Sequence, residues 1–302
     1  MWFKNLRIYR LTSRFNLSPE DLGKTLEAQV FKPCGNLDPM RYGFVPPLGR
    51  HGVELVHATD GNLMVCAKKQ EKLIPGGVVK DALDEKVSEI KAQGRSVGRK
   101  ERQELKDEII FSLLPRAFSR TRLDFAYFDI KKQWLVVNSA SAKRAEELIN
   151  ALRQALGTLP CVPLASEINP VMQMSQWLQQ AHADAPFVFG EECELNAPKD
   201  GRVVRVKKQD LSADEIRNHL SVGLRVQKMA LNWKEAISFV LDEQLAIKRV
   251  KFNDVLSEQA DDRRAESAAE EFDASFAIMA LAVRDFTAEL LHALGGEAAA
   301  DS

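Results

Sequence analysis

Residues 201–220 constrain the fold of this chain most, because they predict a strand that runs directly into a helix. Val204 and Val206 alternate with Arg205 and Lys207, so a strand here has one apolar face and one basic face. A chain built from such units has to bury the apolar face of the strand against a neighbouring helix or sheet.

The helix start that follows is equally well marked. Ser212 can cap the free amides of the first turn, and Glu215 three residues later can bond back to the cap. Leu211 and Ile216 have the spacing of a hydrophobic staple. We therefore expect a capped helix that holds the end of the preceding strand in place.

The strand ends in Lys207, Lys208 and Gln209, which can all donate hydrogen bonds to an anionic backbone. Strand alternation predicts that Lys207 and Lys208 point to opposite faces. Two adjacent lysines are also typical of an ordinary solvated strand, and that alternative stays open at this point.

The distribution of charge favours a polyanion as the partner. The net charge is −1, yet residues 253–302 contain twelve acidic residues and only three arginines, a net of −9. The preceding 252 residues therefore have a net charge of +8. A basic body can attract a polyanion although the total charge is near zero, because local fields steer association.

Composition excludes several other classes of protein. No apolar run reaches the roughly 20 residues of a membrane-spanning helix, and the first fifteen residues lack the apolar core of an export signal. Four separated cysteines without a CxxC pair, and five scattered histidines, favour a reducing compartment and argue against structural zinc. We expect a cytoplasmic protein with no membrane partner and no cofactor.

Alternating short patterns predict an α+β fold with antiparallel sheets, and the proline- and glycine-rich residues 31–52 should be irregular. Helices are expected from Pro19, after a Ser18 cap, and at residues 78–92, 100–114, 142–156, 171–179 and 254–294. Strands are expected at residues 2–11, 53–58, 63–73, 123–130, 134–138, 187–195, 203–207, 224–231, 236–241 and 245–252.

These elements suggest three parts. Residues 1–75 plus 115–160 form a central α+β domain, residues 76–114 a helical-hairpin tip, and residues 161–302 a C-terminal α+β base domain with a long terminal helix. Residues 157–163 (GTLPCVP) are the best candidate for a linker. The last helix has an apolar seam that packs in its own core or, alternatively, against a second subunit: Phe272, Phe276, Met279, Val283, Phe286 and Leu290.

Motifs of catalysis are missing from the sequence. It contains no GxSxG, HExxH or GxGxxG pattern. Residues 23–25 (Gly-Lys-Thr) imitate a phosphate-binding loop, but Ser18 stands where that loop needs glycine. Residues 191–194 (EECE) are not expected to bind a metal, because alternate side chains of a strand point apart. The sequence therefore predicts no enzyme.

Three basic segments are candidates for binding a polyanion: Arg95, Arg99 and Lys100 in the hairpin loop, Arg116 and Arg120 around Phe118, and Arg205, Lys207, Lys208 and Gln209. Such cations give salt-sensitive affinity without sequence preference when they contact phosphates. Phe118 is either a core anchor or an exposed aromatic contact.

Seven segments spread from end to end resemble the bacterial RdgC family of recombination-associated proteins: WFKNL (2–6), FKPCG (31–35), VPPLG (45–49), SLLPRAFSR (112–120), ASAKRAE (140–146), KKQDLS (207–212) and ALGGEA (293–298). The resemblance implies an elongated, crescent-shaped, multi-lobed subunit that closes with a second copy into a ring-shaped homodimer. It implies a basic central hole for double-stranded DNA, binding without sequence preference (also of single-stranded DNA), and a place in the nucleoid.

The resemblance further implies that the protein restrains RecA-mediated recombination by holding DNA. The residues that matter in the family fall on Phe118, Lys208 and Gln209. Two alternatives remain: a regulator that contacts the recombinase directly, and a DNA-processing enzyme.

Overall fold

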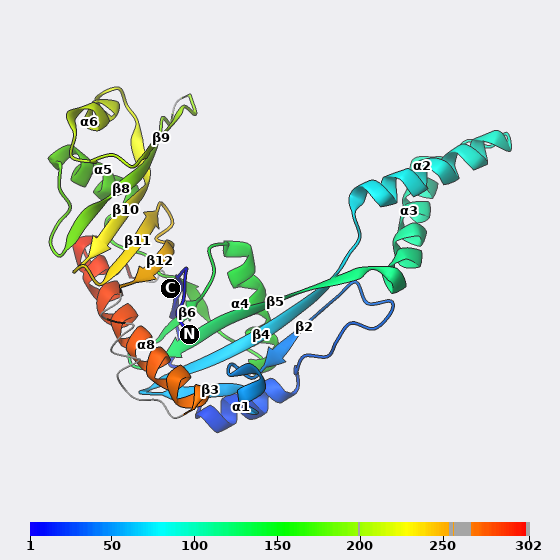
Figure 1. The fold of residues 1–302 in the computed structure, drawn as a ribbon, viewed down its shortest axis with the longest axis horizontal. Coiled ribbons are helices and arrows are strands. Elements are labelled where there is room, and N and C mark those ends of the chain that lie inside the picture. The colour runs from blue at the N-terminus through cyan, green and yellow to red at the C-terminus, as the bar shows by residue number, and fades with distance from the viewer. Residues whose placement is uncertain (199, 254–255, 257–266, 300–302) are drawn as a thin grey trace.

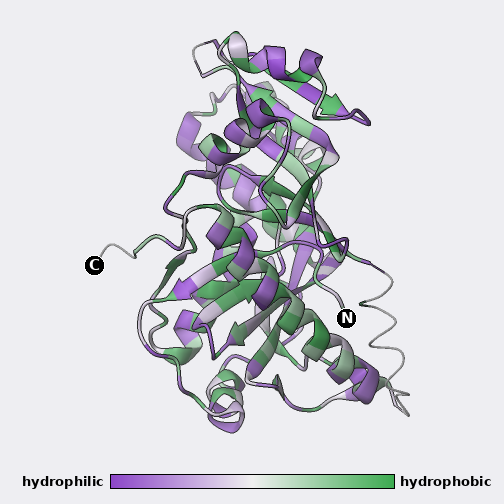
Figure 2. Ribbon diagram, turned by 90° about the vertical axis from the view of Figure 1, so that its left-hand side faces the viewer, coloured by the Kyte–Doolittle hydropathy of each residue, from purple (hydrophilic) through white to green (hydrophobic). Residues whose placement is uncertain are grey.

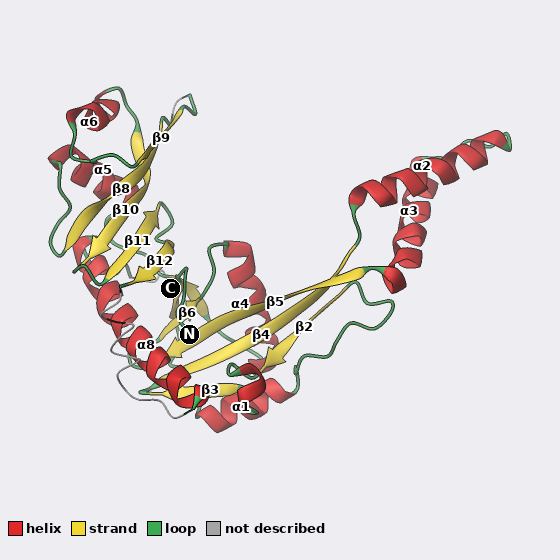
Figure 3. Ribbon diagram, viewed as in Figure 1, coloured by secondary structure: helices red, strands yellow, loops and turns green. Residues whose placement is uncertain are grey.

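The computed structural model describes residues 1–198, 200–253, 256 and 267–299. It confirms an α+β fold with antiparallel sheets, which Figure 3 shows as two separate groups of strands. The described helices are α1 (Pro19–Glu27), α2 (Gly76–Ala92), α3 (Arg99–Leu113), α4 (Ala142–Leu156), α5 (Pro170–Gln180), α6 (Asp214–Ser221) and α8 (Ala268–Ala293). Among these residues, no helix combines the length and apolarity that crossing a bilayer requires.

A seven-stranded sheet forms most of the first half of the chain. Its strand order is β2-β4-β5-β6-β1-β7, and β3 pairs with β4 outside this path. The strands are β1 (Arg7–Leu11), β2 (Met40–Val45), β3 (Val56–Thr59), β4 (Asn62–Leu73), β5 (Phe118–Asp129), β6 (Trp134–Val137) and β7 (Cys161–Pro163). The expected hairpin turn at Asp60 and Gly61 joins β3 to β4, and both residues have positive φ there.

The second half forms a five-stranded sheet in the order β12-β11-β10-β8-β9. Its strands are β8 (Phe187–Asn196), β9 (Val203–Lys207), β10 (Arg225–Trp233), β11 (Ile237–Asp242) and β12 (Ile247–Phe252). Figure 2 shows hydrophobic and hydrophilic residues mixed along the ribbon of the whole molecule. Buried and more exposed residues alternate along β9 and along most of β10. This confirms the period-two pattern expected of residues 203–207.

The helical hairpin projects from the end of the longest strand pair. β4 and β5 have twelve residues each, and α2 and α3 lie between them in the chain, beyond their paired ends. Figure 1 places this hairpin and the β9–α6 region at opposite ends of the longest axis of the molecule. Any ligand that contacts both regions of one chain therefore has to be long.

Helix α8 joins the two sheets. Its Phe276 and Phe286 are completely buried in one apolar cluster that contains residues of both sheets, which confirms the seam as intrachain core. Phe286 packs edge-on against Phe239 of β11. On the other side, the Arg284 guanidinium donates to Asp129 of β5 at 2.6 Å, and both side chains are nearly inaccessible.

Four sequence-based expectations need correction or fall outside the described residues. The stretch 31–52 contains β2, because Gly43 lets the backbone of Phe31 approach so closely that a Cβ would lie 2.6 Å from it. β5 begins at Phe118, five residues earlier than expected. Residues 157–163 include β7, which pairs with β1. The expected start of the last helix, at residues 254–266, lies almost wholly outside the described residues.

Candidate nucleic-acid interface

The five-stranded sheet has one face covered by helices and one face open to solvent. On the covered face, Trp177 of α5 stacks against Phe187 of β8, and Phe286 of α8 packs edge-on against the same ring. Residues directly opposite each other in an antiparallel pair lie on the same face. The register Arg205–Glu194–Lys228 therefore places one row of charged side chains across β9, β8 and β10 on the open face.

The open face is hollowed in two neighbouring places, of about 190 Å³ and about 530 Å³. Six cations and three carboxylates line the two hollows: Arg205, Lys207, Lys208, Lys228, Arg249 and Lys251, with Glu191, Glu192 and Glu194. This set is called the basic face below. Its excess of three positive charges suits an anionic polymer better than a neutral ligand.

Two of the carboxylates are already engaged by cations. Glu194 accepts from Arg205 at 2.8 Å and from Lys228 at 2.7 Å, and these two hydrogen bonds hold the pKa of Glu194 below its ordinary value. The hydrogen bond from Arg249, at 2.6 Å, likewise lowers the pKa of Glu192, with a further contribution from the charge of Lys207. Both carboxylates are therefore ionised at neutral pH.

Lys208 does not follow the alternation of the strand. β9 ends at Lys207, and Lys208 has φ of 55°, in the left-handed region that residues other than glycine seldom adopt. Lys207 lines the smaller hollow and Lys208 the larger one, and Glu192 and Arg249 line both. The left-handed backbone at Lys208 interrupts the regular alternation from which opposite faces were expected, and the two lysines border neighbouring hollows.

The segment after Lys208 is held in place differently from the expected capping box. Asp210 accepts from the backbone N–H of Ser212 at 2.9 Å and from its hydroxyl at 2.7 Å. Helix α6 begins two residues later, at Asp214, without a side-chain cap. Leu211 is completely buried and anchors the turn. Gln209 is exposed, and its N–H donates to the Glu191 carbonyl at 3.4 Å.

Sequence reasoning missed the contribution of β12. Arg249 and Lys251 line the larger hollow opposite Lys208. The signal was the sequence IKRVKF of residues 247–252, in which three cations stand between apolar residues of an expected strand. Only the sheet order shows that these two distant segments border one face.

The hairpin cations lie elsewhere. Arg95, Arg99 and Lys100 are all exposed near the loop between α2 and α3. Arg95 pairs with Glu101 at 2.9 Å, whereas Lys100 is only loosely paired with Glu104 at 3.9 Å. The structure does not bring these residues to the basic face of the same chain (Figure 1).

Phe118 is an exposed aromatic side chain and not a core anchor. It begins β5 at the base of the hairpin, has 84% of its surface accessible, and lies opposite the half-exposed Leu73 of β4. Arg116 is exposed beside it, and Arg120 is held by Glu71 at 3.0 Å. Phe118 and the paired Leu73 together expose two adjacent apolar side chains at this end of the sheet.

Within residues 191–194, Glu192 and Glu194 pair with cations, Cys193 is buried and Glu191 is exposed. Glu192 and Glu194 have the partners described above, and burial raises the pKa of the Cys193 thiol to about 12. Across the part of the chain that the structure describes, no group of three or more His, Cys, Asp or Glu side chains is arranged to hold a metal ion.

Comparison with known proteins places the whole chain in one family. A family model described as "Putative exonuclease, RdgC" matches residues 1–297. The chain is 47% identical over 299 residues to the "Recombination-associated protein RdgC" of Aeromonas hydrophila subsp. hydrophila, covering 98% of this chain and 99% of that protein. The proteins of the same name from Tolumonas auensis (43% over 301 residues; 99% and 100% covered) and Pseudomonas putida (44% over 300 residues; 98% and 98%) are similarly close. The chain therefore belongs to the RdgC family of recombination-associated proteins.

Proposed function

We propose that this protein binds duplex DNA without sequence preference and thereby restrains RecA-mediated recombination. The observation that supports the proposal most is the basic face, where five cations on three strands and Lys208, directly after β9, line two hollows. Lysine and glutamine side chains that donate hydrogen bonds to phosphates position a protein on DNA without reading its bases. The recombination-associated names of the relatives agree with DNA as the partner.

The same proposal includes a ring. The subunit is a crescent in which residues 1–75 plus 115–160 and 161–302 are two domains of the wall and residues 76–114 form a tip. Two copies close around the duplex as a homodimer, so that the hairpin cations and the basic face act on one DNA molecule. Phe118, exposed at the base of the hairpin, lies where the ring opens for loading.

This function needs no catalysis and no cofactor, and it places the protein in the cytoplasm on nucleoid DNA. Single-stranded DNA is a second ligand, because phosphate contacts do not require a paired strand. The description of the family model as an exonuclease makes one control necessary. Labelled duplex, single-stranded and branched DNA should remain intact with Mg²⁺ or Mn²⁺, and metal-dependent degradation that an acidic-residue variant abolishes would replace this proposal.

The direct test is the double variant Lys208→Ala/Gln209→Ala. Fluorescence anisotropy should show weaker binding by the same factor for two duplexes of unrelated sequence, because the lost contacts are to phosphates. Unchanged affinity at low salt would remove these residues from the DNA interface.

The second measurement is strand exchange by RecA in the presence of the protein. The variant should restrain strand exchange less, in proportion to its lost affinity for DNA. An alternative mechanism, direct contact with the recombinase, predicts binding between the two proteins without DNA and full restraint by the variant.

A further inference from the structure

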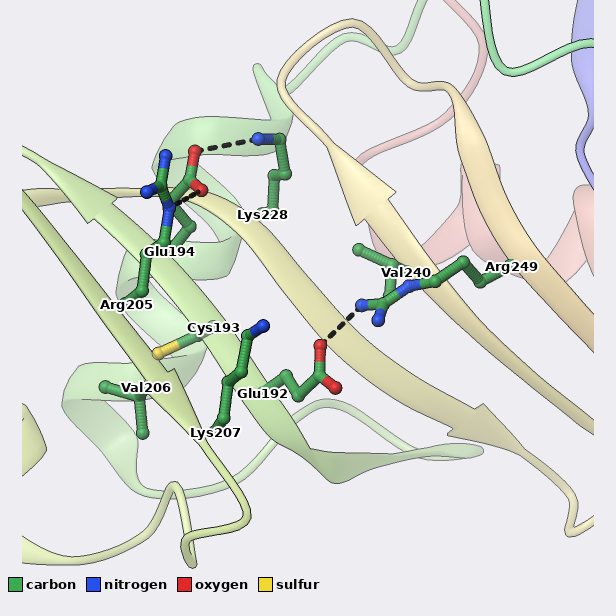
Figure 4. Close-up of a pocket in the computed structure, with 9 residues that line it drawn as sticks. All are labelled: Glu192, Cys193, Glu194, Arg205, Val206, Lys207, Lys228, Val240 and Arg249. Atoms are coloured by element: carbon green, nitrogen blue, oxygen red, sulfur yellow. Dashed lines mark hydrogen bonds and ion pairs between the residues drawn. The ribbon is translucent and has the colours of Figure 1, made fainter.

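The side chain of Arg249 bridges the open face of the five-stranded sheet. β12 and β8 are three strand spacings apart, about 14 Å, yet the guanidinium of Arg249 lies 2.6 Å from Glu192. Figure 4 shows the Arg249 side chain extended past Val240 toward the Glu192 carboxylate. This ion pair, called the bar below, separates the two hollows. The side chain of Arg249 has 56% of its surface accessible and that of Glu192 34%.

Irregular backbone on both sides of the bar makes this reach possible. Arg249 has φ of 53°, and the pairing of β11 with β12 shifts register between Ser238 and Val240. Such bulges re-aim a side chain, and a left-handed arginine is an unfavourable conformation that persists where the surroundings fix it. Here the backbone N–H of Arg249 donates to the Asn5 side chain at 3.2 Å.

The opposite bulge clears space under the bar. The pairing of β8 with β10 shifts register between Met229 and Leu231, and Gly190 faces this irregularity. A Cβ at Gly190 would lie 2.8 Å from that of Ala230, so only glycine fits. The larger hollow opens at this place, with Lys208 and Lys251 on its rim.

A guanidinium fork binds carboxylate and phosphate in the same planar geometry. Among the described residues, no carboxylate forms an ion pair with Lys208 or Lys251 on the adjoining rim. We infer that Arg249 is a further phosphate-binding residue of the basic face, and that Glu192 occupies its guanidinium as an internal competitor until a DNA phosphate replaces it. This inference rests on the proposed function.

The test uses the full-length protein and a labelled duplex in a salt titration. Arg249→Gln keeps the Cβ, Cγ and Cδ carbons and a polar end but removes the charged fork, and should weaken binding about 3- to 10-fold and make the salt slope shallower by about one per chain. Glu192→Gln should strengthen binding several-fold. In the background of Arg249→Gln, that gain should shrink to less than half, because the competitor acts through Arg249.

Controls separate this inference from the proposed function. Arg41→Gln removes an equally exposed arginine paired with Asp38 on the other sheet, and should leave affinity unchanged. If Lys208→Ala/Gln209→Ala weakens binding and Arg249→Gln does not, the inference is wrong and the proposed function stands. If neither variant weakens binding, the proposed function itself fails. Weaker binding by Glu192→Gln would also refute the competitor role.

Folding is checked by the urea midpoint of each variant. If Arg249→Gln lowers the midpoint, Arg249→Lys takes its place, since it keeps the charge and loses the fork. It should bind DNA more weakly than the unmodified protein with an unchanged salt slope. Equal affinity of Arg249→Lys and the unmodified protein would exclude a forked phosphate contact.

Discussion

The salt dependence of DNA binding follows from the charges of the basic face. Each chain has three more cations than carboxylates there, so a dimer offers about six net phosphate contacts. Each contact contributes about 0.9 to the slope of log affinity against log salt, which predicts a slope of about −5. Affinity should therefore fall roughly 10³-fold between 50 and 200 mM salt.

Lys208→Ala removes two of these contacts per dimer. The slope should become shallower by about 1.8, so that the loss between the two salt concentrations shrinks roughly tenfold. Anisotropy of a labelled duplex at four or more salt concentrations measures both slopes. Lys24→Ala, an exposed lysine on α1, is the matched control and should change neither. An identical slope for Lys208→Ala and the unmodified protein would refute a phosphate contact at Lys208.

Three further predictions concern stability and loading. Arg284→Met leaves Asp129, which is 1% exposed, without its cation, and should cost about 3–5 kcal/mol of unfolding free energy in urea; a loss under about 1 kcal/mol would contradict a buried pair. In the folded protein, Glu194 has a pKa below its ordinary value of 4.5. The stability that its ion pairs give the fold is therefore fully present above pH 4.5, and it is lost as the pH falls through the lowered pKa. Glu194→Gln should accordingly reduce the urea midpoint at pH 7 and much less at pH 3, and equal reductions would refute the pairing. Phe118→Ala should slow loading onto circular DNA more than binding to linear ends, with an unchanged urea midpoint; equal effects on both DNA forms would indicate a simple contact.

Local periodicity predicted most of the fold. α4 has the expected bounds, and the hairpin helices and the strands of the second sheet lie within a few residues of their expected places. β2 escaped prediction because its pairing depends on the distant strand β4 and on the close approach of Phe31 to Gly43. Its local composition favours irregular structure, and tertiary pairing overrides that preference.

The candidate site was predictable only in part. The basic strand and the resemblance of KKQDLS indicated Lys208 and Gln209, but no local pattern indicated the left-handed backbone at Lys208, which interrupts the alternation of the strand. The pairing of Arg249 with Glu192 joins residues 57 positions apart across two intervening strands. No local pattern contains that contact, which depends on the sheet order and on bulges.

Two copies of the chain that encircle DNA are linked to it topologically, and this link can be measured. A chemically crosslinked dimer is loaded on closed circular DNA and moved to about 1 M salt, where the Debye length is about 3 Å and phosphate contacts are screened. The crosslinked dimer should stay on the circle and leave once one restriction cut linearises it. Release from the intact circle as fast as from the linear form would contradict a ring.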